Sequence, residues 1–169
     1  MKTARSVAAL IVAVGLIGGG YLAFQKAGGA EPLPNVAYTL LDGTKTTTEQ
    51  LRGKVVLINF WATSCTTCVR EMPHLVSTYE KFKDRGYDTL AVAMSYDPPA
   101  YVINFAETRK LPFGVAIDNT GAIAKEFGNV QLTPTSLLLN KRGEIVKRYV
   151  GEPDFVALHK LVDQLLAES

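Results

Sequence analysis

The sequence predicts an α/β fold in which a central mixed β-sheet is covered by helices on both faces. The first observation is the segment KVVLINFW at residues 54–61, which is β-branched and apolar on both faces, as a central strand is. The second is that strand-like and helix-like segments alternate after it, and a short hairpin signal joins the last two strand-like segments. A chain of 169 residues suits one such domain, with room for an appendage.

The charge of the chain is unevenly distributed. The formal net charge is +2, but Lys2, Arg5 and Lys26 all precede Glu31, and every acidic residue lies at or after Glu31. The remainder of the chain is therefore close to neutral, and its basic residues are scattered along the sequence. Nucleic-acid binding requires a basic patch or stripe, so we do not expect a nucleic-acid partner.

Residues 1–26 are typical of a targeting segment. Lys2 and Arg5 form a short positive start, and residues 7–24 carry no charge. This run is near the short end of the about 17–25 apolar residues that span a bilayer, and it is longer than a signal-peptide core of about 7–15 residues. We therefore predict a retained transmembrane signal-anchor, with a signal peptide cleaved among residues 27–30 as the alternative. Either outcome places the rest of the chain outside the cytoplasm, where disulfides can form.

The region after this segment divides into a linker and a domain. Residues 27–35 are rich in Gly, Ala and Pro and are expected to be a linker, and the domain is expected at residues 36–169. It should begin with a β-hairpin at residues 38–48, because Asp42-Gly43 favours the tight turn that hairpins use.

A helix is expected directly after the central strand. Residues 66–85 place their apolar side chains on one helical face, and Gly86 stands where a helix would end. Pro73 lies inside this segment and should kink the helix. A later short helix should be capped at its start by Asn119 or Thr120. The remaining expected elements are strands at 88–94, 113–117, 135–139 and 144–150, and helices at 98–109, 121–127 and 153–167.

The chain contains two cysteines, Cys65 and Cys68, between the central strand and the helix that follows it. A zinc site would need two further ligands, and neither His74 nor His159 has the spacing of a zinc ligand. Copper(I) needs fewer ligands and prefers thiolates, so a copper-handling dithiol remains an alternative. A purely structural disulfide is a weak explanation, because closing so short a loop removes little chain entropy.

A reactive dithiol explains the position of the cysteines better. Cys65 falls where a helix begins, and the unpaired N–H groups and partial positive charge of a helix start stabilise a thiolate. Cys68 follows one turn later and can reach a disulfide formed at Cys65. Two cysteines at this spacing in a strand–helix–strand setting indicate a redox motif.

The same residues carry a resemblance to a known family. The segment WATSCTTCVREMP, with VVLINFW at residues 55–61 before it and LTPT at residues 132–135 after it, resembles the TlpA/ResA-like membrane-anchored thioredoxins over residues 36–167. The resemblance implies a thioredoxin-like fold with an N-terminal β-hairpin and an inserted helix and strand at residues 98–117. It also implies a single-pass protein of the inner membrane whose domain faces the periplasm, or a soluble periplasmic protein if the segment is cleaved.

The implied activity is thiol–disulfide exchange with partner proteins. Members of this family often reduce apocytochrome c or another cysteine-containing protein, sometimes one that serves copper-site assembly. A membrane dithiol donor facing the same compartment is then the expected source of electrons. No Gly-rich dinucleotide loop is present in the sequence, so no nicotinamide or flavin cofactor is expected. Apart from the copper-handling alternative, no metal is expected either. We expect a monomer.

The resemblance also assigns roles to individual residues. Cys65 is expected to attack, Cys68 to resolve, and Glu71 to take the proton that Cys68 releases. Pro134 matches a cis-proline beside the active site, and Thr133 before it and Trp61 are expected to contact the substrate. The plainer alternatives are an ordinary helix carboxylate for Glu71, core packing for Trp61 and a loop proline for Pro134.

Three departures from the family pattern bear on reduction potential and partner choice. Ser64 stands where the family often has Trp, Thr66-Thr67 between the cysteines carries neither Pro nor charge, and Asn59 stands where thioredoxin has a buried Asp. A thiol peroxidase is a further alternative, but its Thr three residues before the reactive cysteine is replaced by Ala62.

Overall fold

The computed structural model describes residues 30–168. The predicted signal-anchor at residues 1–26 and the start of the predicted linker lie outside this range. Among the residues that the structure describes, no helix is both long enough and apolar enough to cross a membrane.

A six-stranded mixed sheet forms the centre of the domain, in the order β1-β8-β7-β4-β5-β6. The strands β4, β5 and β6 run parallel to one another, whereas β7 is antiparallel to both β4 and β8, and β1 is antiparallel to β8. A separate hairpin is made of β2 and β3. The bounds are β1 Glu31–Pro32, β2 Ala37–Thr39, β3 Lys45–Thr47, β4 Val55–Trp61, β5 Tyr87–Ala93, β6 Gly114–Ile117, β7 Thr135–Leu139 and β8 Glu144–Val150.

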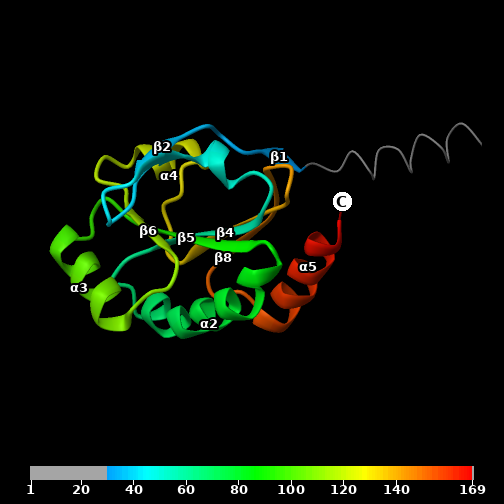
Figure 1. The fold of residues 1–169 in the computed structure, drawn as a ribbon. Coiled ribbons are helices and arrows are strands. Elements are labelled where there is room, and N and C mark those ends of the chain that lie inside the picture. Colours follow the sequence, from blue (N-terminus) through cyan, green and yellow to red (C-terminus); the bar gives the residue numbers. More distant parts are fainter. Residues whose placement is uncertain (1–29, 169) are drawn as a thin grey trace, which may run out of the picture. The chain divides into compact units, whose positions relative to one another are not determined.

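Helices cover both faces of the sheet, as the sequence predicts. In Figure 1, α2, α3 and α5 lie on one side of the sheet, while α4 and the β2–β3 hairpin lie on the other. The bounds are α2 Thr66–Phe82, α3 Pro99–Arg109, α4 Ala122–Glu126 and α5 Phe155–Ala167, with 3-10 turns at η1 Thr48–Leu51 and η2 Lys83–Arg85.

Strand β4 separates two hydrophobic clusters, and every one of its residues is buried. Val56, Ile58 and Phe60 face the cluster that includes α4 and the hairpin, whereas Val55, Leu57 and Trp61 face the cluster that includes α2 and α5. A strand that is buried on both faces has to be apolar throughout, which explains its sequence. Asn59 is the polar exception in the strand and is also fully buried.

Three details of the fold differ from the sequence-based prediction. Helix α2 ends at Phe82, and the expected last turn to residue 85 is the 3-10 turn η2. The N-cap position of α4 is Gly121 rather than Asn119, and Thr120 contributes only a long hydrogen bond of 3.4 Å from the Ala122 N–H to its Oγ1. The carboxylate of Asp118 instead accepts hydrogen bonds from the N–H groups of Ile123 and Ala124, at 3.2 and 2.8 Å. The short strand β1 pairs with β8, which adds a strand that the pattern of the linker did not indicate.

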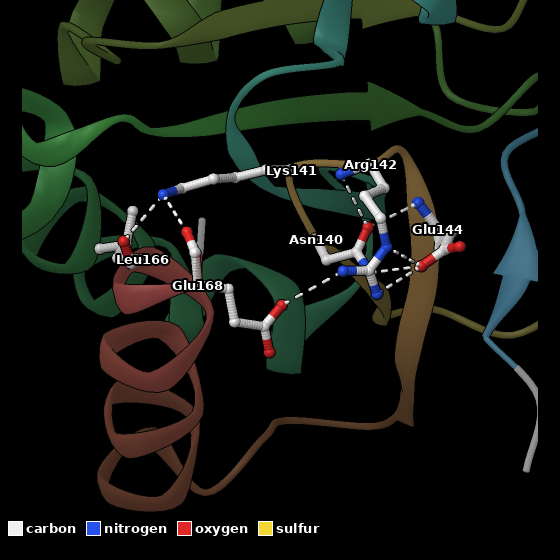
Figure 2. A network of polar contacts seen from close by, with 6 residues as sticks. All are labelled: Asn140, Lys141, Arg142, Glu144, Leu166 and Glu168. Carbon is white, nitrogen blue, oxygen red and sulfur yellow. Dashed lines mark hydrogen bonds and ion pairs between the residues drawn. The ribbon is translucent and has the colours of Figure 1, made fainter. Parts of the chain in front are cut away.

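Charged side chains surround the turn between β7 and β8, at the end of the sheet far from the cysteines. Figure 2 shows Lys141 donating hydrogen bonds to the carbonyl oxygens of Leu166 and Glu168, at 2.9 and 2.6 Å. Arg142 pairs with Glu144 at 2.8 Å. A cation at the C-terminal end of a helix is stabilised by the helix dipole. The contacts of Lys141 therefore join the end of α5 to the turn between β7 and β8.

Candidate active site

The two cysteines lie at the junction between β4 and α2. Strand β4 ends at Trp61, and Cys65 is the N-cap of α2. Cys65 and Cys68 form a disulfide with their Cα atoms 5.2 Å apart, and the Cys65 Sγ accepts a hydrogen bond of 3.1 Å from the Cys68 N–H. Cys65 is partly exposed, whereas Cys68 is fully buried. The pair therefore presents one sulfur to a partner and keeps the other inside.

The first turn of α2 provides the electrostatic setting of Cys65. No acidic residue lies in that turn, and the Cys68 N–H already points at the Cys65 Sγ. A negative charge on this sulfur would be stabilised by the free N–H groups of the helix start. This arrangement favours Cys65 as the attacking thiol and as the leaving group of a mixed disulfide.

Glu71 lies one turn beyond Cys68 and is fully buried, with 0% of its surface exposed. Its Oε1 accepts a hydrogen bond of 2.8 Å from Asn59 Nδ2. Burial raises the pKa of the Glu71 carboxyl to about 7, and the hydrogen bond from Asn59 opposes that shift. A carboxyl with a pKa near neutral pH can both accept and return a proton under physiological conditions.

Asn59 connects Glu71 to strand β7. Its Nδ2 also donates a hydrogen bond of 2.9 Å to Ser136 Oγ, and Asn59 and Ser136 are paired in the β4–β7 register. Asn59 Oδ1 and Glu71 Oε2 are buried and have no hydrogen-bond partner among the described residues. Asn59 was expected as a departure from the family pattern, whereas no sequence pattern singled out Ser136. The signal that could have identified the pair is a polar residue within each of two fully buried strands.

The cis-proline loop, residues 131–134, lies next to the cysteines. The Thr133–Pro134 peptide bond is cis, which confirms the expected geometry of Pro134. Thr135, which follows Pro134, pairs with Phe60 near the end of β4, so this loop stands beside the start of the cysteine motif. Thr133 is partly exposed and Leu132 is exposed. The structure therefore brings Thr133 and Pro134 to the same edge of the sheet as Cys65.

Trp61 occupies a different position from the one that a contact with substrate would need. Its side chain is fully buried and packs against Phe105 of α3, with ring centroids 5.1 Å apart. Core packing, the plainer alternative for Trp61, is the role that this position fits.

The two histidines lie away from the cysteines. The His74 ring packs against Phe155 at 5.0 Å, and His159 lies 2.9 Å from Thr78 Oγ1. Burial lowers the pKa of His159, and the charge of Lys81 lowers it further. Within residues 30–168, no group of three or more His, Cys, Asp or Glu side chains could hold a metal ion.

Comparison with known proteins agrees with this geometry. The sequence profile of the Redoxin family matches residues 27–165. The thiol-disulfide oxidoreductase ResA of Bacillus thuringiensis is 39% identical over 119 residues, which cover 70% of this chain and 68% of the relative. The ResA of Halalkalibacterium halodurans is 36% identical over 111 residues, covering 66% of this chain and 62% of the relative.

Solved structures show the same fold. A candidate thioredoxin from Neisseria meningitidis superposes with a TM-score of 0.77 and 40% identity, covering 83% of this chain and 93% of the other. A candidate thiol:disulfide interchange protein DsbE from Chlorobium tepidum superposes with a TM-score of 0.75 and 26% identity, covering 82% and 97%.

Proposed function

The chain belongs to the Redoxin family and is a thioredoxin-fold thiol–disulfide oxidoreductase of the TlpA/ResA-like kind, and from this premise we propose that it reduces disulfides of partner proteins outside the cytoplasm. The observation that carries the proposal is the arrangement of three side chains at the start of α2. Cys65 is accessible, Cys68 is buried behind it, and a buried carboxyl at Glu71 follows one turn later with its pKa raised to about 7.

The reaction proceeds through a mixed disulfide. The Cys65 thiolate attacks one sulfur of a partner disulfide, and the other partner sulfur leaves as a thiolate. The Cys68 thiolate then attacks the Cys65 Sγ, so that the Cys65–Cys68 disulfide forms and the second partner thiolate leaves. Two electrons pass from the pair to the partner in this sequence. The disulfide present in the structure corresponds to its product.

Glu71 serves as the base for the second step. Cys68 is fully buried and has to lose its proton before it can attack, and a carboxylate one turn away on the same helix face can accept that proton. Asn59 holds the carboxyl in place through its hydrogen bond to Oε1. The transfer moves one negative charge from the Glu71 carboxylate to the Cys68 sulfur, so no second charge is created in the protein interior.

The partner is a cysteine-containing protein that binds over the exposed edge formed by Cys65 and the cis-proline loop. Thr133 contributes its backbone to an extended segment of the partner, and Pro134 sets the direction of that backbone. The exposed side chains of Leu132 and Val150 line one surface hollow beside this loop and support this proposal, because exposed apolar side chains that gather in one place are typical of interaction sites.

The family membership supports a proposal for the location and the electron source. We place the domain at the periplasmic side of the inner membrane, held by the segment at residues 1–26, and the domain includes β1, which pairs with β8. A membrane dithiol donor restores the reduced pair, and cytochrome c maturation or copper-site assembly is the process served. The uncharged run at residues 7–24 and the ResA relatives support this placement.

The reduction potential of the Cys65–Cys68 pair tests the proposed direction. The chain from Glu31 onward would be equilibrated against defined thiol–disulfide buffers, and bound copper would be assayed in the same sample. A potential near or below about −230 mV is expected for a reductant. A potential near about −120 mV would make the protein an oxidant and overturn the proposed direction. If the purified protein contains bound copper and its cysteine pair does not interconvert between the reduced and oxidised forms, the copper-handling alternative would be favoured.

A further inference from the structure

We propose that Tyr96 and Asp97 are positioning residues that join the two loops of the active site. The cysteine loop is residues 62–64, between β4 and Cys65, and the cis-proline loop is residues 131–134. Tyr96 and Asp97 are neighbours in a third segment, the bridging loop at residues 94–98, which connects β5 to α3. Neither residue belongs to the cysteine motif or to the proton-transfer pair of Asn59 and Glu71.

Asp97 holds the cysteine loop from inside. Its side chain is 2% exposed, and its carboxylate accepts two hydrogen bonds from Thr63, one from the N–H at 2.6 Å and one from Oγ1 at 2.5 Å. Thr63 stands two residues before Cys65. Hydrogen bonds to a carboxylate are shorter and stronger than bonds between neutral groups. The pair therefore fixes the backbone that delivers Cys65 to the helix start.

The bridging loop is itself fixed to the end of β4. The Met94 N–H donates to the Trp61 carbonyl at 2.9 Å, and the Asp97 N–H donates to the Met94 carbonyl at 2.9 Å. These bonds form a turn that directs the Asp97 carboxylate toward Thr63. The bridging loop is thus joined to the end of β4 by a backbone hydrogen bond and to the cysteine loop by the hydrogen bonds of the Asp97 side chain.

Tyr96 holds the cis-proline loop from outside. Its side chain is 56% exposed, and its hydroxyl shares a hydrogen bond of 3.2 Å with Thr133 Oγ1, next to the cis peptide bond. Adjacent residues of the bridging loop thus point in opposite directions, with Asp97 directed into the protein and Tyr96 directed to its surface. The Tyr96 ring lies beside the edge at which we propose that a partner binds.

The two residues are therefore expected to act on different properties. Asp97 positions Cys65 and affects its reaction with any disulfide, so this part requires only the oxidoreductase activity. Tyr96 positions Thr133 and adds an aromatic surface, so it affects protein disulfides more than small ones. This second part rests on the proposed binding of partners at the cis-proline loop.

Two disulfides of different size test these roles in the full chain. The reduced protein would be mixed with oxidised glutathione or with insulin, and the second-order rate constant of its oxidation would be measured for each. Asp97→Ala is expected to slow the reaction with oxidised glutathione about tenfold, because misplacing a reacting group by about 1 Å can cost up to about a hundredfold. Asp97→Asn should recover most of the rate. The amide oxygen can accept the hydrogen bond from the Thr63 N–H, and the amide NH2 can donate one to Thr63 Oγ1.

Asp118→Ala is the matched control for Asp97→Ala. Asp118 is also 2% exposed and also binds backbone N–H groups, but it caps α4 and does not contact the cysteine loop. It should lower the melting temperature without changing the rate. If Asp97→Ala does not fold, Thr63→Val carries the same test, because it removes the Oγ1 bond and keeps the N–H. Wild-type rates in the folded variants would overturn the role of Asp97.

Tyr96→Phe removes the hydroxyl and keeps the ring. The ratio of the insulin rate to the glutathione rate is expected to fall about threefold, as the loss of one exposed hydrogen bond predicts. Tyr101→Phe is the matched control, because Tyr101 is 64% exposed on the neighbouring helix α3 and has no hydrogen bond to the cis-proline loop among the described residues. An unchanged ratio in Tyr96→Phe, or an equal fall in both variants, would overturn the role of Tyr96 while leaving that of Asp97 intact.

Discussion

Two asparagine–glutamate pairs lie at opposite ends of the sheet and behave in opposite ways. At the cysteine end, Asn59 donates to Glu71 at 2.8 Å, and at the β7–β8 turn, Asn140 donates to Glu144 at 2.6 Å. The pKa of Glu71 is raised to about 7 by burial. The pKa of Glu144 is lowered, first by the hydrogen bond from Asn140 and then by that from Arg142.

The comparison shows that a hydrogen bond from asparagine lowers the carboxyl pKa where the carboxylate is exposed, and that burial outweighs the same bond at Glu71. The Glu144 side chain is 33% exposed. Its carboxylate lies beside the cation of Arg142, as Figure 2 shows. The Glu71 carboxyl has no adjacent cation within hydrogen-bond distance, and its Oε2 has no partner among the described residues. Burial outweighs the Asn59 hydrogen bond and the charge of Arg70 and favours the neutral form of Glu71, which is the condition for proton exchange near neutral pH.

The largest effect on disulfide exchange is expected from substitution of the cysteines. They lie at the end of the sheet that contains Asn59 and Glu71, and not at the β7–β8 turn. Cys65→Ser should abolish disulfide exchange, because the thiol that attacks the partner is lost. Cys68→Ser should retain the attack and accumulate mixed disulfides with partner proteins, since the resolving thiol is missing. Non-reducing gel electrophoresis of cell extracts measures both outcomes. Equal trapping by the two variants would contradict the assignment of Cys65 as the attacking thiol.

The next largest effect is expected from Glu71→Gln on the resolution step. Loss of a general base typically costs about a hundredfold or more, and we expect a decrease of about tenfold to a hundredfold because solvent can still remove the proton slowly. The wild-type rate should rise with pH through about 7 as Glu71 ionises, and the variant should lose that inflection. Rapid-mixing measurements of the decay of the mixed disulfide report this rate.

Glu144→Gln is the matched control for this kinetic prediction. It changes the same chemical group in the other asparagine–glutamate pair, far from the cysteines along the sheet. Its resolution rate and pH profile should match those of the wild type. A pH profile that is unchanged in Glu71→Gln would remove Glu71 from the mechanism.

The same two substitutions should change stability in opposite directions. The folded-state pKa of Glu71 lies above its unfolded value, so its contribution to stability is greatest below about pH 4.5 and is lost as the pH rises to about 7. Glu71→Gln should therefore stabilise the oxidised protein by about 3 kcal/mol at pH 8, an order-of-magnitude value from the size of the shift, and by little at pH 4.5. Urea unfolding at the two pH values measures this difference.

Glu144 has a depressed pKa, so its contribution is present at neutral pH and is lost as the pH falls through its folded-state pKa. Glu144→Gln should therefore reduce stability slightly at pH 8, and the difference from the wild type should vanish in acid. Destabilisation by Glu71→Gln at pH 8 would show that its carboxylate is stabilised in the folded protein, contrary to the proposed environment.

The smallest effect is expected at the exposed charges of the β7–β8 turn. Arg142→Ala removes the contacts with Glu144 and Glu168 that Figure 2 shows. Exposed ion pairs contribute little and are screened by salt, so the melting temperature should change by less than about 3 °C, and by less still in high salt. Scanning calorimetry at two salt concentrations measures this. A larger fall that salt does not reduce would indicate that the network is structural.

Local patterns in the sequence were sufficient to predict much of the fold. The apolar run of β4 gave the central strand, the Asp42-Gly43 turn gave the β2–β3 hairpin, and the spacing of apolar residues gave α2. The resemblance to the family added the cis geometry of Pro134. Each of these depends on residues that are close together in the chain, or on a motif that is itself local.

By itself, the sequence determined which residues form strands and helices and where the reactive cysteines stand among them. Only the tertiary structure decided which side chains meet: Ser136 with Asn59, Asp97 with Thr63, Tyr96 with Thr133, and Trp61 with Phe105 in the core. These contacts join residues far apart in the chain, so they depend on strand register and burial. The physical reason is that periodicity records which face of an element is apolar, whereas contacts and pKa shifts depend on what packs against that face.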